Sequence, residues 1–312
     1  MSDSNERRHW LRADPEVARV QPQHAEAGEA DTAGTAPPAD VPAAAADASA
    51  ATLVDPAMRR TGPRPPIPAL DVARVEPLLL TTVQVTTLLG DFVLTRASAF
   101  FFRRERRLFL VTSRHVLFDG ETAHLPDAIE IGVHTAAGDL ARSATVRLPL
   151  YADGRGLWRQ GEDGGGDIDV AVLEVHRGLL PATAVLHAFG PEHLLPTLTA
   201  AEAGSPVLLV GFPLGFHDTL HHLPVVRHAI IASSFGLRFQ GQGCFLTDAR
   251  AHRGSSGAPV VMRANAPGVA LPWKLLGVHS SRFDMGGRDM AQDESLGLNC
   301  AWYADILMTL TA

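Results

Sequence analysis

From about residue 77 onward, the hydrophobic residues fall in short runs separated by turn residues. Runs such as TTVQVTTLL, SAFFFRR, RLFLVTS and DVAVLEV have the length of strands and are rich in Val, Phe, Thr and Leu, a composition typical of β-strands. Turn segments such as FDGE, YADGRG and EDGGGD separate them. Sustained helical periodicity is absent until CAWYADILMTLTA, which predicts a C-terminal helix over about residues 301–311.

The number and spacing of these runs predict an all-β fold. Roughly six runs precede residue 180 and six follow residue 200, which suits two six-stranded antiparallel β-barrels. We expect the first barrel over about residues 77–185 and the second over about residues 195–300.

The composition changes sharply before the first of these runs. Residues 1–76 are dominated by Ala, Pro, Asp, Glu and Arg, as in GTAPPADVPAAAADASAA. Such a segment cannot bury enough apolar surface to offset the entropy of ordering it. We therefore expect a disordered N-terminal tail over residues 1–76, followed by one β-rich domain over residues 77–312.

Charge and composition narrow the possible partners. The 312 residues carry a formal net charge of -7 and show no nucleic-acid-binding motif, so nucleic acid is not an expected partner. No apolar run approaches the roughly 20 residues needed to cross a bilayer, and the N-terminus lacks the apolar core of a signal peptide. We expect a cytoplasmic protein without a membrane partner. The oligomeric state stays open.

The segment HRGSSGAPVV, residues 252–261, places two serines between glycines and ahead of an apolar run. A nucleophilic serine needs a base and a group that orients the base, as well as backbone N–H groups directed at the developing oxyanion. His115 follows the apolar run RLFLVTS, and Asp169 opens the run DVAVLEV after a glycine turn. Asp167, two residues earlier, is the one rival for the orienting carboxylate.

These three segments resemble the trypsin-like, chymotrypsin-fold serine peptidases, in particular the bacterial HtrA-like and glutamyl-endopeptidase-like groups. LVTSRHV resembles the family's Thr-x-x-His strand end, DVAVL its aspartate segment, and GSSGAP its nucleophile loop. VGFPLG resembles a turn early in the second barrel, whereas ASAFFF at residues 97–102 replaces the usual G-[ST]-G-F. No PDZ-like segment is expected after Ala312.

The resemblance implies a role for each residue. Ser256 would be the nucleophile, His115 the general base and Asp169 the residue that orients it, while the N–H groups of Gly254 and Ser256 would form the oxyanion hole. The implied activity is a serine endopeptidase that acts on protein or peptide substrates and needs no cofactor or metal. Ser255 is read as a loop residue.

The residues near Ser256 and in the run LLGVHSS predict the substrate specificity. His279, in LLGVHSS, resembles the histidine that contacts Glu or Gln in glutamyl endopeptidases and in viral 3C-like peptidases. With Arg250 and Arg253 nearby in sequence, an acidic or amide side chain before the cleaved bond is the prediction. Packing of His279 within its strand, with both arginines facing solvent, is the alternative.

Two other functions can be compared with the sequence. An α/β-hydrolase would need G-x-S-x-G with an acid and then a histidine following it, which this order of residues does not supply. A trypsin-like domain that binds peptides or acts as a scaffold without turnover remains the alternative, since the sequence does not exclude a collapsed oxyanion loop. The segment FHDTLHHLP, with three histidines, is expected to form a solvated loop rather than a zinc site.

Overall fold

The β-runs of the sequence form two antiparallel sheets in the computed structural model, which describes residues 71–264, 268–282 and 297–312. Within those residues the first sheet has the order β5-β4-β1-β2-β3-β9-β8. Its strands are β1 (Thr82–Leu89), β2 (Phe92–Arg104), β3 (Arg107–Thr112), β4 (Ala128–His134), β5 (Ser143–Pro149), β8 (Trp158–Asp163) and β9 (Gly166–Glu174). A small hairpin of β6 (Tyr151–Ala152) and β7 (Arg155–Gly156) joins β5 to β8.

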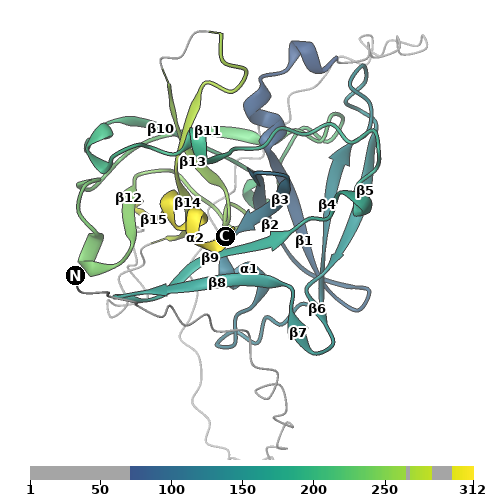
Figure 1. Cartoon of the computed structure of the whole chain (residues 1–312), viewed down its shortest axis with the longest axis horizontal. Helices are drawn as coiled ribbons and strands as arrows, with labels where there is room; N and C mark the ends of the chain where they lie inside the picture. The colour runs from purple at the N-terminus through teal and green to yellow at the C-terminus, as the bar shows by residue number, and fades with distance from the viewer. Residues whose placement is uncertain (1–70, 265–267, 283–296) are drawn as a thin grey trace, which may run out of the picture. The chain divides into compact units, whose positions relative to one another are not determined.

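The second sheet has the order β11-β10-β13-β14-β15-β12. Its strands are β10 (Pro206–Gly211), β11 (Val225–Ile230), β12 (Cys244–Thr247), β13 (Pro259–Arg263), β14 (Trp273–Arg282) and β15 (Asn299–Tyr303). Its two edge strands meet, since Ile231, just after β11, is bridged to Thr247 of β12. In the first sheet, Leu157 N–H donates to the Leu150 carbonyl oxygen at 2.8 Å, which joins the two edges. Figure 1 shows the two sets of strands side by side.

The prediction of two antiparallel barrels is therefore confirmed, with one difference in strand number. The first sheet has seven strands in the described part of the chain rather than six. The additional strand is β8, whose sequence WRQGED is mostly polar and whose residues are mostly not fully buried. A strand of this kind carries no clear apolar alternation, so it reads as part of a turn region until its pairing with β9 is seen.

Both ends of the domain also differ from the prediction. Residues 301–303 belong to β15 rather than to a helix, because that strand pairs on both sides, with β12 and β14, and is wholly buried. The helical part is shorter: η10 (Ala304–Ile306) and then α2 (Leu307–Leu310). At the other end, η3 (Val72–Arg74) lies in the segment predicted as tail; the rest of that segment, up to residue 70, falls outside the described residues.

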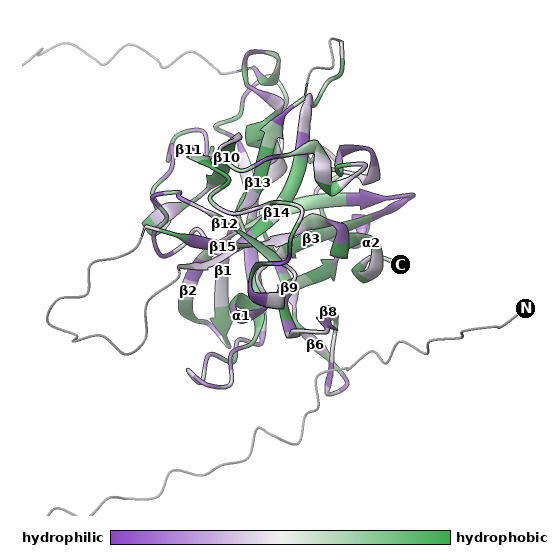
Figure 2. Cartoon of the chain, turned by 90° about the vertical axis from the view of Figure 1, so that its left-hand side faces the viewer, coloured by the Kyte–Doolittle hydropathy of each residue, from purple (hydrophilic) through white to green (hydrophobic). Residues whose placement is uncertain are grey.

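The three largest apolar clusters of the described residues hold the domain together. One fills the first barrel, a second fills the second barrel, and the third lies between them. Along β2 the side chains alternate, so that Phe101 faces the first barrel's interior while Phe100 and Phe102 join the cluster shared with Val210 and Val278 of the second barrel. Full burial of each such ring is worth about 1.5–3 kcal/mol. Figure 2 shows the apolar colour concentrated on strands such as β13 and β14.

The remaining short helices are all connections. They are η4 (Pro77–Thr81), α1 (Arg114–Leu117), η5 (Arg177–Leu179), η6 (Pro191–His193), η7 (Leu198–Ala200), η8 (Pro213–Gly215) and η9 (Phe239–Gly241). None of the helices in the described ranges is both long enough and apolar enough to span a bilayer.

A test of the contact between the barrels is Gly257→Ala. Gly257 has φ +83°, and an added Cβ would lie 2.1 Å from the Ser98 carbonyl oxygen and 2.2 Å from Thr112 Oγ1. We expect urea denaturation to show a loss of about 2–4 kcal/mol, from backbone strain plus overpacking. Gly154→Ala is the control, because Gly154 also has positive φ but an added Cβ meets nothing within 4 Å; it should cost only about 1 kcal/mol. Equal losses would contradict the packing argument.

Candidate active site

His115 lies just beyond the end of β3, in the single turn of α1. Its main-chain N–H donates to Asp169 Oδ1 at 2.8 Å, and its ring Nδ1 lies 2.7 Å from Asp169 Oδ2. An ionised carboxylate only accepts hydrogen bonds, so Nδ1 carries the proton and Nε2 keeps its lone pair. Burial lowers the pKa of His115, but the hydrogen bond and charge of Asp169 outweigh it and raise that pKa above its ordinary value.

Asp169 is directed at His115 by an irregularity in β9. Gln160 of β8 pairs with Ala171 and Gly161 pairs with Ile168, so Asp169 and the residue after it are opposite no residue of β8. Such bulges change the direction of side chains near functional sites. Burial raises the pKa of Asp169, but hydrogen bonds and the charge of His115 more than offset this, so the pKa lies below its ordinary value. The carboxylate is therefore ionised at neutral pH.

The carboxylate of Asp167, the rival to Asp169, lies near Arg114 instead. Asp167 is half exposed, and its Oδ2 lies 3.9 Å from a guanidinium nitrogen of Arg114. It has no hydrogen bond to His115 among the described residues, so the geometry favours Asp169 as the imidazole's partner.

Ser256 lies in the loop of residues 252–258, which we call the nucleophile loop. The loop is held by several main-chain hydrogen bonds: Ser98 N–H donates to the Ser256 carbonyl at 2.9 Å, and Gly257 N–H donates to the His279 carbonyl at 2.8 Å. The N–H of Ser255 is also used, donating to the His252 carbonyl oxygen at 3.0 Å. Within the described chain, the N–H groups of Gly254 and Ser256 donate to no protein group, as free oxyanion donors require.

A residue that the sequence analysis missed connects the three predicted catalytic side chains. Ser280, in β14, donates a short hydrogen bond from its hydroxyl to Asp169 Oδ2, and its carbonyl oxygen accepts from Ser256 Oγ at 3.1 Å. The structure thus brings His115, Asp169 and Ser256 together through Ser280. Within the described residues, Ser256 Oγ donates to this carbonyl and not to His115. Position directly after His279 was the only sequence signal for Ser280.

His279 is buried in β14, next to Ser280 in the chain. Its carbonyl oxygen accepts from Ser113 Oγ at 3.1 Å, and its N–H donates to the Ala258 carbonyl oxygen at 2.9 Å. Burial, together with the nearby positive charge of His115, lowers the pKa of His279 to about 4. The ring is therefore neutral near pH 7, and its buried Nδ1 has no partner among the described residues.

The two arginines predicted near the substrate are exposed. Neither Arg250 nor Arg253 makes a side-chain hydrogen bond or ion pair within the described residues, so their part in substrate binding stays a prediction. The main chain of Arg253 does have a role, because its carbonyl oxygen accepts from Leu214 N–H at 2.6 Å.

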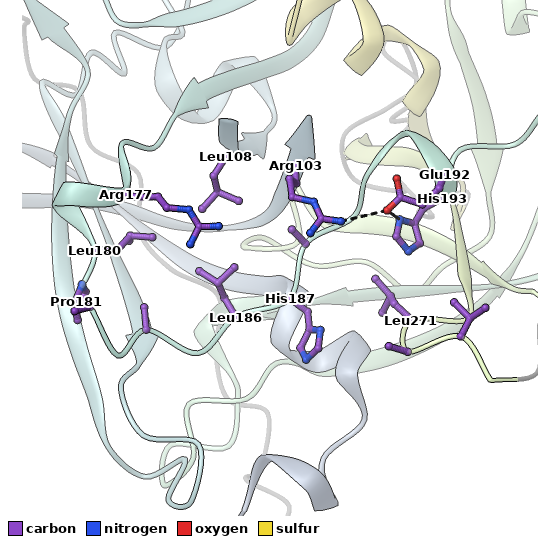
Figure 3. Close-up of a pocket in the computed structure, with 15 residues that line it drawn as sticks. Arg103, Leu108, Arg177, Leu180, Pro181, Leu186, His187, Glu192, His193 and Leu271 are labelled. Carbon is purple, nitrogen blue, oxygen red and sulfur yellow. Dashed lines mark ion pairs between the residues drawn. The ribbon is translucent and has the colours of Figure 1, made fainter. Parts of the chain in front are cut away.

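Two cavities lie outside this group of residues. A cavity of about 750 Å³ adjoins the nucleophile loop, with His252 in its wall beside Leu214, Phe216 and Val226. The cavity in Figure 3, of about 600 Å³, has Arg103, Arg177 and Glu192 around it and contains none of the predicted site residues. In the part of the chain that is described, no group of three or more His, Cys, Asp or Glu side chains could hold a metal ion.

Two antiparallel barrels that share a half-buried carboxylate–imidazole pair beside a glycine-flanked serine define a trypsin-like architecture. Residues 97–267 match the family model for the trypsin-like peptidase domain, and these residues make up more than half of the chain. The chain belongs to the trypsin-like peptidase domain family.

Solved structures of proteases are also similar. The structure of the HtrA-type protease AlgW with tripeptide is 19% identical in sequence and has a TM-score of 0.46. The match covers 77% of this chain and 60% of that chain. The serine endoprotease from Yersinia pestis is 16% identical, with a TM-score of 0.44 and coverage of 77% and 63%. The chain thus spans about 60% of the length of the solved structures it matches. No curated protein matches the chain significantly.

The buried His279 predicts a dependence of stability on pH. With an ordinary pKa near 6.5 in the unfolded chain and about 4 in the fold, the unfolded state binds the proton first as pH falls. The stability that the neutral ring contributes is present above pH 6.5 and is lost between about pH 6.5 and 4. We expect His279→Leu to flatten this part of the curve of unfolding free energy against pH, measured by urea denaturation. If His279→Leu left the slope of unfolding free energy against pH unchanged in this range, His279 would not be the group that titrates there.

Proposed function

We propose that the chain is a serine endopeptidase that hydrolyses peptide bonds through an acyl-enzyme on Ser256, with His115 as general base and Asp169 as the orienting carboxylate. The observation that carries the proposal is the His115–Asp169 pair, joined through Ser280 to Ser256. Membership of the trypsin-like peptidase domain family supports it.

In the proposed reaction, Ser256 Oγ attacks the carbonyl carbon of the scissile bond while His115 Nε2 accepts its proton. The oxyanion so formed accepts hydrogen bonds from the Gly254 and Ser256 N–H groups. The carbon–nitrogen bond then breaks, and the leaving amine takes the proton from Nε2. Water, deprotonated by His115, attacks the acyl-enzyme, and release of the new carboxylic acid returns the proton to Ser256.

The Ser256 hydroxyl has to turn for this reaction. Its O–H group now donates to the Ser280 carbonyl oxygen, and rotation about the Cα–Cβ bond would direct it to His115 Nε2. Contacts of this kind often tighten only when substrate binds. The same observation is what favours the competing function, a latent trypsin-like domain that binds peptides without turnover.

For specificity, we propose an acidic or amide side chain before the cleaved bond, with His279 at the base of its pocket. Support comes from the neutral, buried ring and its unpartnered Nδ1 among the described residues. A neutral imidazole suits the amide of Gln or the protonated carboxyl of Glu. A peptide library screened at the position before the cut tests this, and a preference for large apolar side chains would end the proposal.

Fluorophosphonate labelling separates the peptidase from the latent domain. Wild type and Ser255→Ala should label, and Ser256→Ala should not, because the reagent needs an activated serine. Ser256→Ala should also lower kcat by about 10⁴-fold or more. Folded wild type that neither labels nor cleaves peptides would reject the peptidase proposal and favour the binding function.

The raised pKa of His115 sets the expected pH profile. Because the base must be unprotonated, kcat/KM should fall as pH is lowered through a pKa above the ordinary value of about 6.5. Asp169→Asn should move this midpoint downward and lower kcat by about 10⁴-fold. A midpoint that is the same in Asp169→Asn and in wild type would show that the carboxylate does not act on the titrating group.

A further inference from the structure

Ser98 is a fully buried polar residue where the two barrels meet. It lies in β2, and its hydroxyl donates to the Gly254 carbonyl oxygen at 2.8 Å and accepts from Phe212 N–H at 3.0 Å. Its main-chain N–H donates to the Ser256 carbonyl oxygen at 2.9 Å, and its carbonyl oxygen accepts from Thr112 Oγ1 at 2.8 Å. Every polar group of Ser98 therefore has a partner at or beside the candidate active site.

Two glycines make room for the close approach of these segments. A Cβ added at Gly211 would lie 2.7 Å from Ser98 Oγ, and one added at Gly254 would lie 2.5 Å from the Phe212 carbonyl oxygen. Gly254 also has φ +90°, a conformation that side chains other than glycine rarely adopt. The end of β10, the nucleophile loop and β2 thus come together around one oxygen atom.

A hydrogen bond from the same turn fixes the peptide between Arg253 and Gly254, which carries one of the proposed oxyanion donors. Leu214 N–H binds the Arg253 carbonyl oxygen at 2.6 Å. In a trans peptide the carbonyl oxygen and the following N–H point in opposite directions, and the described residues contain no cis peptide. The Gly254 N–H therefore points away from the turn of residues 212–215.

We propose that Ser98 is a positioning residue that keeps the Gly254 and Ser256 N–H groups directed at the oxyanion. It does so by joining the turn of residues 212–215 to the nucleophile loop through its hydroxyl. This inference rests on the proposed peptidase function. The sequence ASAFFF, which departs from the family pattern at residues 97–102, therefore keeps a serine whose hydroxyl has a specific use.

Loss of the hydroxyl should affect the transition state more than the bound substrate. Without it, Phe212 N–H loses its acceptor and the Gly254 carbonyl oxygen loses its donor. The peptide between Arg253 and Gly254 is then freer to turn its carbonyl oxygen toward the oxyanion position. Full negative charge develops on the substrate oxygen only in the transition state, so the loss appears in kcat rather than in KM.

The test compares Ser98→Ala with wild type in the full chain. We expect kcat to fall about tenfold, a fraction of the 10²–10³-fold typical of losing a donor itself, with KM changed by less than about twofold. The Ki of a peptide aldehyde, whose adduct oxygen occupies the oxyanion position, should rise by the same factor as kcat falls. The midpoint of the pH profile should stay that of wild type, since the His115–Asp169 pair is not touched.

Thr81→Ala is the matched control, because it removes another buried hydroxyl that donates to a main-chain carbonyl, that of Leu78 at 2.6 Å. It should leave kcat and the aldehyde Ki within about twofold of wild type. Ser98→Cys, which keeps a weaker hydrogen-bonding group, should fall between Ser98→Ala and wild type, and serves as the readout if Ser98→Ala does not fold.

The outcomes separate this inference from the proposed function. Wild type that neither cleaves peptides nor labels with fluorophosphonate would overturn both. The role of Ser98 would be overturned, and the peptidase left intact, if wild type is active and Ser98→Ala has the same kcat and aldehyde Ki as Thr81→Ala. If Ser98→Ala does not fold, the same comparison is made with Ser98→Cys. A rise in KM with unchanged kcat would also overturn it, because that result indicates substrate binding and not the oxyanion.

Discussion

The candidate site depends on hydrogen bonds to one largely buried carboxylate, that of Asp169. Asp169 accepts hydrogen bonds from the main chain and ring of His115, in the first barrel, and from the hydroxyl of Ser280, in the second. A buried charge without such donors would cost several kcal/mol. Because the donors come from both barrels, the orientation of the imidazole depends on how the two barrels are docked.

The apolar layer between the barrels makes that docking precise. Phe100 and Phe102 of β2 pack against residues of β10 and β14 in a shared cluster, and close-packed interiors of this kind tolerate little displacement. The polar contacts lie at the end of this layer, where Ser98 joins the first barrel to the nucleophile loop and Thr112 donates to the Ser98 carbonyl oxygen. Irregular pairing in β9 and glycines at positive φ in the loop then supply the directions that regular strands cannot.

Local patterns account for what could be predicted. The two antiparallel barrels follow from apolar runs and turn residues, and His115, Asp169 and Ser256 each stand next to a recognisable strand in the sequence. The missed features are those without a local signal. Polar β8 is a strand because of its partner, and residues 301–303 are a strand because two neighbours pair with them, which overrides their helical periodicity.

The sequence by itself determined the β-rich class, the trypsin-like resemblance and the order of the three candidate catalytic residues. Only the tertiary structure decided which hydroxyls serve them. Ser280 is 111 residues from Asp169, and Ser98 is 156 residues from Gly254, yet each pair is hydrogen-bonded. Serines are common and their contacts carry no periodicity, so such partners are set by how the barrels pack and not by any pattern along the chain.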